Sequence, residues 1–586
     1  MTLRRLFWFS LIFLAPWIIR SQAIEESDLN PFRWNNAVYS CKCYEEDRCW
    51  PSIETWNKLN TTVHGQLHRV IPDAAVCYNS FEGNPTFNAT ACAEVTQNFG
   101  GQQWQSDRAV AAHWILWTNN TCLPTTNPDG RCSLGYYPRY VILAKTRQHI
   151  QAGVDFARKN NIRLVIRNTG HDFLGRSTGY GSLAINTHSF KDVKFIRKHT
   201  GPGGYTGGAV TVGAGIQGRE LLRLANQEKP KLTLVTGECP TVGFAGGFIQ
   251  GGGHGPLASF HGMAADQVLS FDVVTADGKF RTVNAAQDRD LFWALKGGGP
   301  GTFAVVVSVT VKTFTDIPAA GIVLNINQTH TTDETLFWKG FAAFHNLANH
   351  WVENGMFVYY ELFPGSLHVQ PFVGPNMDKE KITEVLQPLL DQLAKDSVPY
   401  SIDVKEYATF FDLYIDLFQD EGAGANALVG GRLFTKQDIA EHGDEIVEAY
   451  KTSGGAVGHI VGPGTGAPEV DNAINPVWRN ASSFSITNIW LDMNATLADK
   501  ATAQKRLTEE IDGPLRAASP HGAAYVNEGD LEEPNWQVAY WGSNYPRLKA
   551  LKAKWDPRGV FYARTTPGTE AWEVIDYGRR LCKKKE

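Results

Sequence analysis

The chain has 586 residues, of which 43% are hydrophobic and 20% charged, and its formal net charge at pH 7 is −5. This balance excludes a chain that is disordered throughout and a protein that binds nucleic acid through a strongly basic surface. The 56 glycines gather in clusters without the triplet repeat of collagen, which indicates close approach of backbone to a ligand. At roughly 150 residues per domain, the length predicts two to four domains.

Residues 1–23 have the pattern of a secretory signal peptide. Arg4 and Arg5 precede the largely apolar run Leu6–Ile19, and Ser21–Ala23 offers small residues before a cleavage point. An uncleaved N-terminal anchor is the alternative, but the run is short for a membrane span. We expect a secreted, monomeric protein with no membrane contact after cleavage. The N-x-[ST] sequons agree with secretion: Asn60, Asn88, Asn119, Asn327, Asn480 and Asn494.

The nine cysteines divide into an even set and one residue left over. The even set predicts four disulfides in an oxidising compartment: Cys41, Cys43, Cys49, Cys77, Cys92, Cys122, Cys132 and Cys582. A zinc site at Cys41, Cys43 and Cys49 is the alternative, although this spacing lacks a CxxC pair and a second half. Cys239 lies alone in a glycine-rich stretch, and an unpaired cysteine in a secreted protein requires an explanation.

Periodic patterns begin after a loop-rich, Cys-rich segment at residues 24–135. Apolar runs predict strands at residues 140–144, 162–167, 182–186, 210–212, 268–275 and 302–314. Helical periodicity predicts helices at residues 149–159, 218–227 and 288–295. Strands that alternate with helices indicate an α/β or α+β fold.

After Pro318 the segments become longer and amphipathic, which predicts a second domain with a sheet covered by helices. Helices are expected at residues 335–352 and 381–395, and strands at residues 356–362 and 483–492. Residues 367–373 are expected to form an edge strand, because Pro371 has no N–H to donate. A last helix is expected from Asn544 until Pro557 stops it.

Three segments are candidates to bind a ligand. Gly213–Gly218 matches G-x-G-x-x-G between a strand and a helix, with Glu238 about 20 residues on, so an NAD-binding Rossmann site is an alternative. Gly237–Gly255 holds eight glycines and predicts backbone wrapped around a ligand, but it lacks the Lys-Ser/Thr of a P-loop. Arg167–Ser177 is a polar loop after a strand that carries His171, which taken alone would be a structural histidine.

Five segments in this order resemble the berberine-bridge-enzyme-like branch of the FAD-linked, vanillyl-alcohol-oxidase-type flavoproteins: Arg167–Ser177, Gly237–Gly255, Phe271–Gly278, Asp290–Gly299 and Asn544–Pro557. The Cys-rich segment is similar to that of the secreted fungal members. The resemblance implies an α+β fold with a two-lobed FAD-binding domain of PCMH type, an α/β substrate-binding domain with an antiparallel sheet, and a C-terminal segment that returns to the FAD domain. The implied parts are a signal peptide at 1–23, the Cys-rich segment at 24–135, the FAD-binding domain at 136–316, the substrate-binding domain at 317–533, a berberine-type segment at 534–575 and a basic tail at 576–586.

The resemblance also implies a doubly attached FAD. His171 would bind the flavin 8α-methyl group and Cys239 would bind flavin C6, which accounts for the odd cysteine; such tethers orient the ring and raise its reduction potential. The other implied FAD contacts are Thr169, Gly170, Arg176, Ser177, Val242, Gly243, Gly247, Gly252, Gly253, His254 and Asn544. Gly247 stands where plant members commonly have a histidine, and His254 is a candidate substitute. Val242 stands at the family's oxygen gate, where valine is typical of oxidases, and plain packing is the alternative. No metal site is expected.

The implied reaction is hydride transfer from an alcohol or secondary-metabolite substrate to flavin N5, followed by reoxidation by O2 to give H2O2. A base must remove the substrate proton. Tyr540, Tyr360 and Glu361, with Tyr359 beside them, are the candidates, and the sequence does not choose among them. The alternatives are an oligosaccharide oxidase of the same fold, a non-catalytic secreted binding glycoprotein, and an NAD-dependent Rossmann dehydrogenase. The expected partners are a small-molecule substrate and O2, with no nucleic acid.

Overall fold

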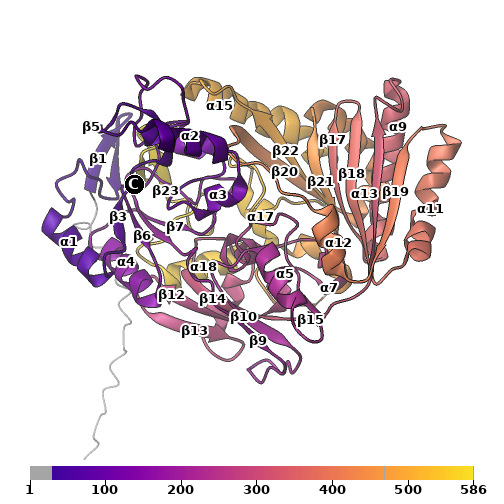
Figure 1. The fold of residues 1–586 in the computed structure, drawn as a ribbon, viewed down its shortest axis with the longest axis horizontal. Helices are drawn as coiled ribbons and strands as arrows, with labels where there is room; N and C mark the ends of the chain where they lie inside the picture. The colour runs from indigo at the N-terminus through magenta and orange to yellow at the C-terminus, as the bar shows by residue number, and fades with distance from the viewer. Residues whose placement is uncertain (1–29, 468, 585–586) are drawn as a thin grey trace, which may run out of the picture.

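The computed structural model describes residues 30–467 and 469–584, so the expected signal peptide lies outside the described residues. Figure 1 shows two lobes, with residues up to about 315 on one side and a large sheet flanked by helices on the other. Most strand pairs are antiparallel and the helices are interspersed with them, so the expected α+β class is confirmed. None of the helices in the described ranges has the length and apolar character needed to cross a bilayer.

The first lobe begins with a four-stranded sheet in the order β3-β6-β8-β7. Its strands are β3 (Leu67–Arg69), β6 (Tyr140–Leu143), β7 (Leu164–Arg167) and β8 (Leu183–Asn186). Helix α4 (Arg147–Lys159) connects β6 to β7; the side chain of its N-cap Thr146 accepts the N–H of His149. The helix buries Ile150, Val154 and Ala157, the apolar stripe that its sequence predicts. The loop that carries His171 starts where β7 ends.

A second sheet in this lobe is antiparallel throughout, in the order β13-β12-β14-β10-β9. Its strands are β9 (Val193–Ile196), β10 (Ala209–Gly213), β12 (Val268–Thr275), β13 (Phe280–Asn284) and β14 (Ala304–Lys312). Helices α5 (Gly218–Asn226) and α8 (Arg289–Leu295) lie beside it. Because β10 has antiparallel neighbours on both sides, Gly213–Gly218 does not open a parallel βαβ unit, and the Rossmann interpretation is wrong.

The second lobe is built on a seven-stranded antiparallel sheet in the order β19-β16-β18-β17-β21-β22-β20. Its strands are β16 (Ala319–Asn327), β17 (Phe357–Phe363), β18 (Ser366–Pro375), β19 (Ser401–Tyr407), β20 (Ala427–Thr435), β21 (Ala456–Ile460) and β22 (Ala481–Trp490). One face is covered by α9 (Glu334–His345), α10 (Ala348–Glu353), α11 (Lys379–Lys395) and α13 (Lys436–Ser453) (Figure 1). The other face turns toward the first lobe, where α12 (Phe410–Leu417) packs.

Two expectations for this lobe are wrong. Strand β18 is central rather than an edge strand. Register shifts between Ile322 and Leu324 on one side, and between Val358 and Tyr360 on the other, leave Pro371 without a paired residue in either ladder, so its missing N–H costs no ladder bond. The single helix expected at residues 335–352 is divided into α9 and α10.

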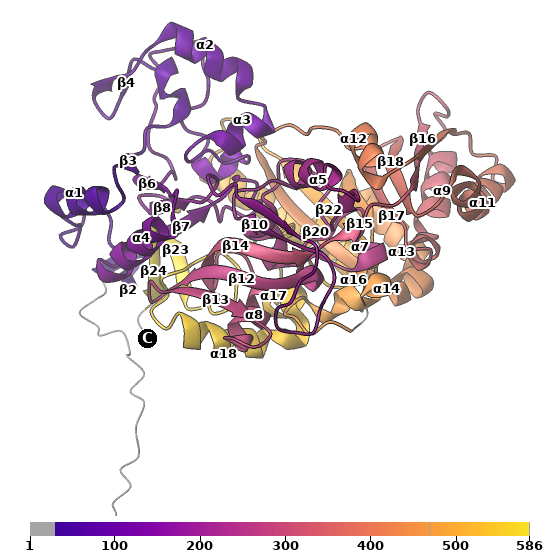
Figure 2. The same ribbon diagram turned by 60° about the horizontal axis from the view of Figure 1, so that its bottom comes forward.

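Four disulfides staple the N-terminal region, as expected: Cys41–Cys582, Cys43–Cys49, Cys77–Cys92 and Cys122–Cys132. The Cys43–Cys49 bond rules out the alternative zinc site. Short helices α2 (Ala89–Asn98) and α3 (Gln102–Asp107) belong to the segment that stands out at the top of Figure 2, whereas α1 (Ile53–Thr62) lies lower, beside α4. Cys239 is the free cysteine.

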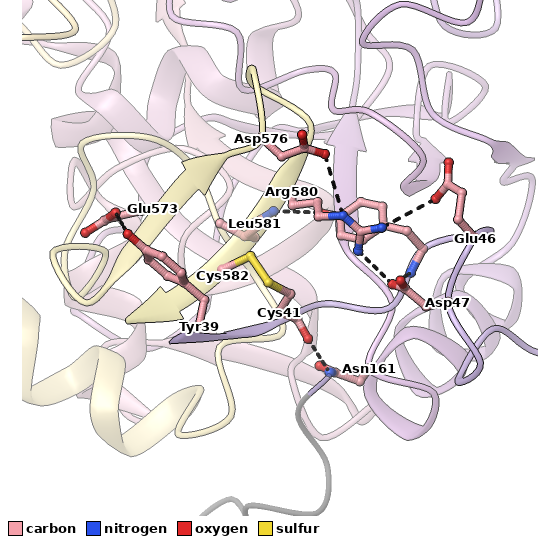
Figure 3. Close-up of a disulfide and its surroundings, with 11 residues drawn as sticks. Tyr39, Cys41, Glu46, Asp47, Asn161, Glu573, Asp576, Arg580, Leu581 and Cys582 are labelled. Atoms are coloured by element: carbon pink, nitrogen blue, oxygen red, sulfur yellow. Dashed lines mark hydrogen bonds and ion pairs between the residues drawn. A yellow bond between two sulfur atoms is a disulfide. The ribbon is translucent and has the colours of Figure 1, made fainter. Parts of the chain in front are cut away.

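Strands near the two ends of the described chain pair in one small sheet, in the order β1-β2-β24-β23. Its strands are β1 (Asn30–Trp34), β2 (Ala37–Cys41), β23 (Trp572–Ile575) and β24 (Arg580–Lys584). Figure 3 shows the Cys41–Cys582 bond between β2 and β24, beside Arg580, which pairs with Asp47 at 2.9 Å. Five residues of the predicted basic tail, Arg580–Lys584, therefore form a paired strand, in which Cys582 is bonded to Cys41 and acidic side chains neutralise Arg580.

The C-terminal segment returns to the first lobe, as the resemblance implied. Helices α17 (Trp536–Trp541) and α18 (Tyr545–Trp555) pack there. The indole N–H of Trp541 donates to the carbonyl of Gly297 at 3.1 Å, and the buried Lys552 ammonium donates to the carbonyl of Thr302 at 2.7 Å. These bonds fix residues after β22 onto the lobe that holds the glycine-rich segments.

Candidate active site

A cavity of about 600 Å³ lies between the two lobes. Its wall combines the loop after β7, the glycine-rich segment, the open face of the seven-stranded sheet, and parts of the N-terminal and C-terminal segments. Ten of the predicted cofactor residues line it: Thr169, Gly170, His171, Arg176, Ser177, Cys239, Val242, Gly243, Gly247 and His254. A volume of this order is typical of a cofactor or ligand site.

Three predicted cofactor residues lie outside this wall. The backbone N–H of Gly253 donates to the hydroxyl of Tyr525, and Gly252 packs against Met263. The side-chain amide of Asn544 donates to the carbonyl of Ile474 at 2.9 Å. These residues lie behind the cavity, and the structure does not bring them into its wall.

The structure places none of the three predicted bases in the cavity wall. Side chains alternate along β17, so Tyr360 points to the helix-covered face, where it is 0% exposed and lies 3.3 Å from the hydroxyl of Tyr450. Its neighbour Tyr359 lines the cavity instead. Glu361 accepts from the Tyr359 hydroxyl at 3.3 Å but stands beyond the wall. Tyr540 is buried and donates to the carbonyl of Asp530.

His171 and Cys239 meet at one hydrogen-bonded centre. The Nε2 atom of His171 lies 2.6 Å from the hydroxyl of Thr241, and that hydroxyl lies 2.9 Å from Oε1 of Gln102. The thiol of Cys239 lies 3.3 Å from the same oxygen. The two side chains that the resemblance implies as tethers therefore converge, although 68 positions separate them in the sequence.

This chain of bonds fixes the tautomer of His171. The amide nitrogen of Gln102 donates to the carboxylate of Glu421 and the carbonyl of Gly422, so its oxygen faces Thr241. An amide oxygen only accepts, so the Thr241 hydroxyl donates to it and must accept from His171. The imidazole thus carries its proton on Nε2, which leaves a lone pair on Nδ1. Within the described ranges Nδ1 has no hydrogen-bond partner.

The loop that carries His171 is held by a buried arginine. Arg167 is 0% exposed, and its guanidinium donates to the carbonyls of Gln105, Ser106 and Ala111 in the N-terminal segment. Gly170 has φ +86°, and a Cβ there would lie 2.6 Å from the carbonyl oxygen of Ala111. A side chain at this position would push the loop away from the segment, which accounts for the glycine.

Burial keeps both candidate tethers uncharged. Desolvation, together with the charge of Arg167, lowers the pKa of His171 to about 3. Desolvation and the nearby Glu421 and Glu238 carboxylates raise the pKa of the Cys239 thiol well above its usual value. At neutral pH the imidazole therefore offers a lone pair and the sulfur keeps its proton.

Several cavity residues have no counterpart in the sequence-based prediction. Gln102, His113 and Trp114 come from the Cys-rich segment, and Glu238, Glu421, His459 and Glu528 supply charge. Glu238 was noted only as the acid of the Rossmann alternative, although its position before Cys239 could have indicated a place in this wall. The others carry no local signal, since their position depends on contacts between distant segments such as the bridges Gly101–Gly422 and Trp114–Ala425.

The residues present fit FAD. Asn168 Oδ1 and Gln250 Oε1 are buried acceptors without a protein partner, and both residues line the cavity; buried polar atoms of this kind call for a ligand donor. The wall formed by Gly243, Gly246 and Gly247 leaves backbone accessible to a bound group. His171 and Cys239 would hold the ring, and the glycine-rich wall would face it.

Comparisons with known proteins agree with this geometry. The family model described as "FAD binding domain" matches residues 138–284, and "Berberine and berberine like" matches residues 524–566. The VAO-type flavoprotein oxidase VAO615 of Thermothelomyces thermophilus is 33% identical over 94% of this chain and 96% of its own length. The crystal structure of the VAO-type flavoprotein MtVAO615 from Myceliophthora thermophila C1 has a TM-score of 0.87 and 32% identity, covering 93% of this chain and 100% of that one. The glucooligosaccharide oxidase of Acremonium strictum, described with a 6-S-cysteinyl, 8α-N1-histidyl FAD, shares the fold at a TM-score of 0.60 and 19% identity over 74% of this chain and 92% of that one.

Proposed function

This chain belongs to the VAO-type FAD-linked oxidoreductases with a berberine-like C-terminal segment, and from that premise we propose that it is a secreted oxidase whose FAD is bonded to both His171 and Cys239. The observation that carries the proposal is the convergence of these two side chains on Thr241 and Gln102 at the cavity wall. The four disulfides support folding in an oxidising compartment.

The state of the two side chains suits the double attachment. The free lone pair on Nδ1 of His171 is the nucleophile that an 8α-histidyl bond requires, and the unpaired thiol of Cys239 is available to the ring. The fold relative from Acremonium strictum is described with the same pair of linkages. When bound, FAD supplies a two-electron hydride acceptor, which no side chain of the protein can provide.

The substrate region supports an alcohol with an apolar body. Val429, Val457 and Ile486 project from the open face of the sheet into the cavity, and the carboxylates lie near Cys239. An apolar body would rest on the sheet while a hydroxyl meets the polar end. Val242 also lines the cavity, in agreement with a role at an oxygen gate. The net reaction is the oxidation of the alcohol to a carbonyl, with reduction of O2 to H2O2.

An oligosaccharide oxidase is the second candidate. Trp114, Phe363 and Trp490 line the same cavity, and Trp490 is 68% exposed. Exposed aromatic rings can stack on sugars as well as on apolar rings. A non-catalytic binding glycoprotein is a weaker candidate, because it would have no reason to keep His171 and Cys239 in contact with one centre.

The test is mass spectrometry of secreted protein expressed with ample riboflavin. We expect FAD on the peptides that contain His171 and Cys239, and fluorescence of the denatured protein band under ultraviolet light. Each single alanine variant should keep one bond, and the double variant should lose flavin on denaturation. Both peptides unmodified would refute the proposal. A screen for H2O2 release with primary alcohols, aromatic alcohols and oligosaccharides then separates the two substrate classes.

A further inference from the structure

Four ionisable side chains form a compact group in the cavity wall, here called the His–Glu cluster: Glu238, His459, His254 and Glu528. Glu238 Oε1 lies 3.2 Å from His459 Nε2, and Glu528 Oε2 lies 3.0 Å from His254 Nε2. The two imidazole rings touch, with centroids 4.7 Å apart. The cluster is thus two carboxylate–imidazole pairs joined through their histidines.

The carboxylates face the cavity while the histidines lie behind them. The side chains of Glu238 and Glu528 are 15% and 17% exposed, against 1% for His459 and 2% for His254. The Nδ1 atoms of both histidines are buried without a hydrogen-bond partner. A group at the cavity surface can therefore exchange a proton with a ligand, and the buried rings behind it have nitrogen sites to hold that proton.

Separate parts of the chain supply the cluster. Glu238 and His254 lie near the two ends of the glycine-rich segment, His459 projects from β21, and Glu528 belongs to the berberine-like segment. A chance surface ion pair would not need three parts of the fold to meet in a cavity. The arrangement indicates that the closed, two-lobed structure is the state in which these groups act together.

The electrostatics of the cluster places the proton of a protonated pair on the imidazole rather than on the carboxylate. Although burial opposes it, the charge and hydrogen bond of His459 hold the pKa of Glu238 to about 2. Burial alone would lower the pKa of His254, but the charge of Glu528 outweighs this effect and raises that pKa.

The titratable groups that face the cluster from neighbouring elements are Cys239, Tyr359, Tyr414, Glu421 and Tyr525. Among them, burial and the charge of Glu238 raise the pKa of Glu421 to about 7. Glu421 can thus change charge near neutrality, so its titration must be separated from that of the cluster in any experiment that varies pH.

The cluster stands beside the reacting edge of the proposed cofactor. Glu238 directly precedes Cys239, and its charge acts on the Cys239 thiol. In flavins, C6 and N5 are bonded to the same ring carbon, so a sulfur attached to C6 brings its neighbours close to N5. This step rests on the attachment proposed above.

We propose that the His–Glu cluster holds the substrate's proton between the two halves of the oxidase cycle. The C–H bond of the alcohol breaks and its electron pair leaves with hydrogen as hydride to FAD, while the O–H proton passes by way of Glu238 to His459, so that the pair becomes a carboxylate and an imidazolium. In the second half, O2 receives the hydride equivalent from the cofactor and the stored proton from the cluster, which gives H2O2. Alcohol and O2 thus become carbonyl compound and H2O2 with no proton left over.

The test measures proton uptake without a substrate. The midpoint potential of the bound flavin is determined against pH from about pH 6 to about pH 8 by dye equilibration. Each proton taken up with two electrons adds about 30 mV per pH unit to the slope. Because negative charge on the reduced ring favours protonation of a neighbouring base, we expect the wild-type slope to exceed that of Glu238→Gln and of His459→Gln by about 30 mV per pH unit.

The matched control is His188→Gln. His188 and Asp107 form a carboxylate–imidazole pair with the same 3.2 Å separation, but neither lines the cavity. This variant should keep the wild-type slope. Glu421→Gln should change the potential without removing the cluster's contribution to the slope. If Glu238→Gln fails to fold or to bind flavin, His254→Gln provides the same comparison.

The outcomes separate the two proposals. Equal slopes in the wild type and both cluster variants overturn the role of the cluster, whether or not the flavin is bonded to Cys239. A flavin bound without that bond refutes the double attachment, while the slope still decides the role of the cluster.

Because Glu238, His254 and His459 also have their ligand atoms within 4.8 Å of one another, metal analysis is included. A stoichiometric divalent metal present in the wild type and lost in His459→Gln would identify a metal site and overturn the proposal.

Discussion

Replacement of Thr241 by valine tests how the fold prepares His171 for attachment. The change removes the hydroxyl that accepts from His171 Nε2 at 2.6 Å and donates to Gln102 at 2.9 Å. If the imidazole keeps its proton on Nε2, a buried donor is left without a partner, which costs about 1–3 kcal/mol. If the proton moves to Nδ1, the nucleophilic lone pair is lost. Since each 1.36 kcal/mol corresponds to a factor of ten, we expect the attachment rate to fall about 5- to 150-fold.

The assay follows attachment directly. Protein from a riboflavin-limited host is mixed with FAD, and the fluorescence of denatured bands is recorded against time. Thr241→Ser is the matched control, because it keeps a hydroxyl at the same position and should retain a rate near that of the wild type. Attachment by Thr241→Val at the wild-type rate would refute the assignment of the tautomer to this hydrogen-bonded chain.

Three further predictions follow from the same region and from the core. Cys239→Ala should keep flavin through His171 but lower its midpoint potential, measured by dye equilibration; an unchanged potential would contradict a tether at Cys239. Arg167→Met leaves three buried carbonyls without their charged donor, so we expect a loss of about 3–5 kcal/mol of stability and faster proteolysis of residues 100–118, with partial recovery in Arg167→Lys. Burial lowers the pKa of His345 to about 3. Between about pH 6.5 and about pH 3 the unfolded chain therefore binds more protons than the folded one, and stability falls as the pH falls. His345→Phe should flatten this dependence in urea unfolding midpoints recorded against pH, and an unaltered dependence would count against the burial argument.

Local patterns in the sequence predict local structure well. The strand expected at residues 268–275 is β12 with the same ends, and the helix expected at residues 149–159 lies within α4. Both are determined by apolar periodicity over a few neighbouring residues. The role proposed for His171 and Cys239 came instead from the resemblance of two motifs to a family, and each of these motifs extends over about a dozen positions.

The prediction fails where a residue's role depends on a partner far along the chain. Strand β17 carries apolar or aromatic side chains on both faces, so its sequence does not tell whether Tyr359 or Tyr360 meets the cavity. Pro371 was expected at an edge because a proline breaks a regular ladder, but paired register shifts in both neighbouring strands accommodate it. Such compensation involves β16 and β17 and leaves no trace in the residues around Pro371.

The Cys-rich segment contributes residues to the cavity wall and is also cross-linked by disulfides. Gln102 contacts Thr241 and Cys239 through its oxygen and Glu421 through its nitrogen, so one side chain of this segment joins the two proposed tethers to the second lobe. Arg167 binds the same segment to the loop of His171 from the opposite side. Because the tautomer of His171 depends on Gln102, the proposed attachment requires this segment to be in place first. If the proposed attachment is right, the disulfides that hold this segment contribute to it as well as to stability.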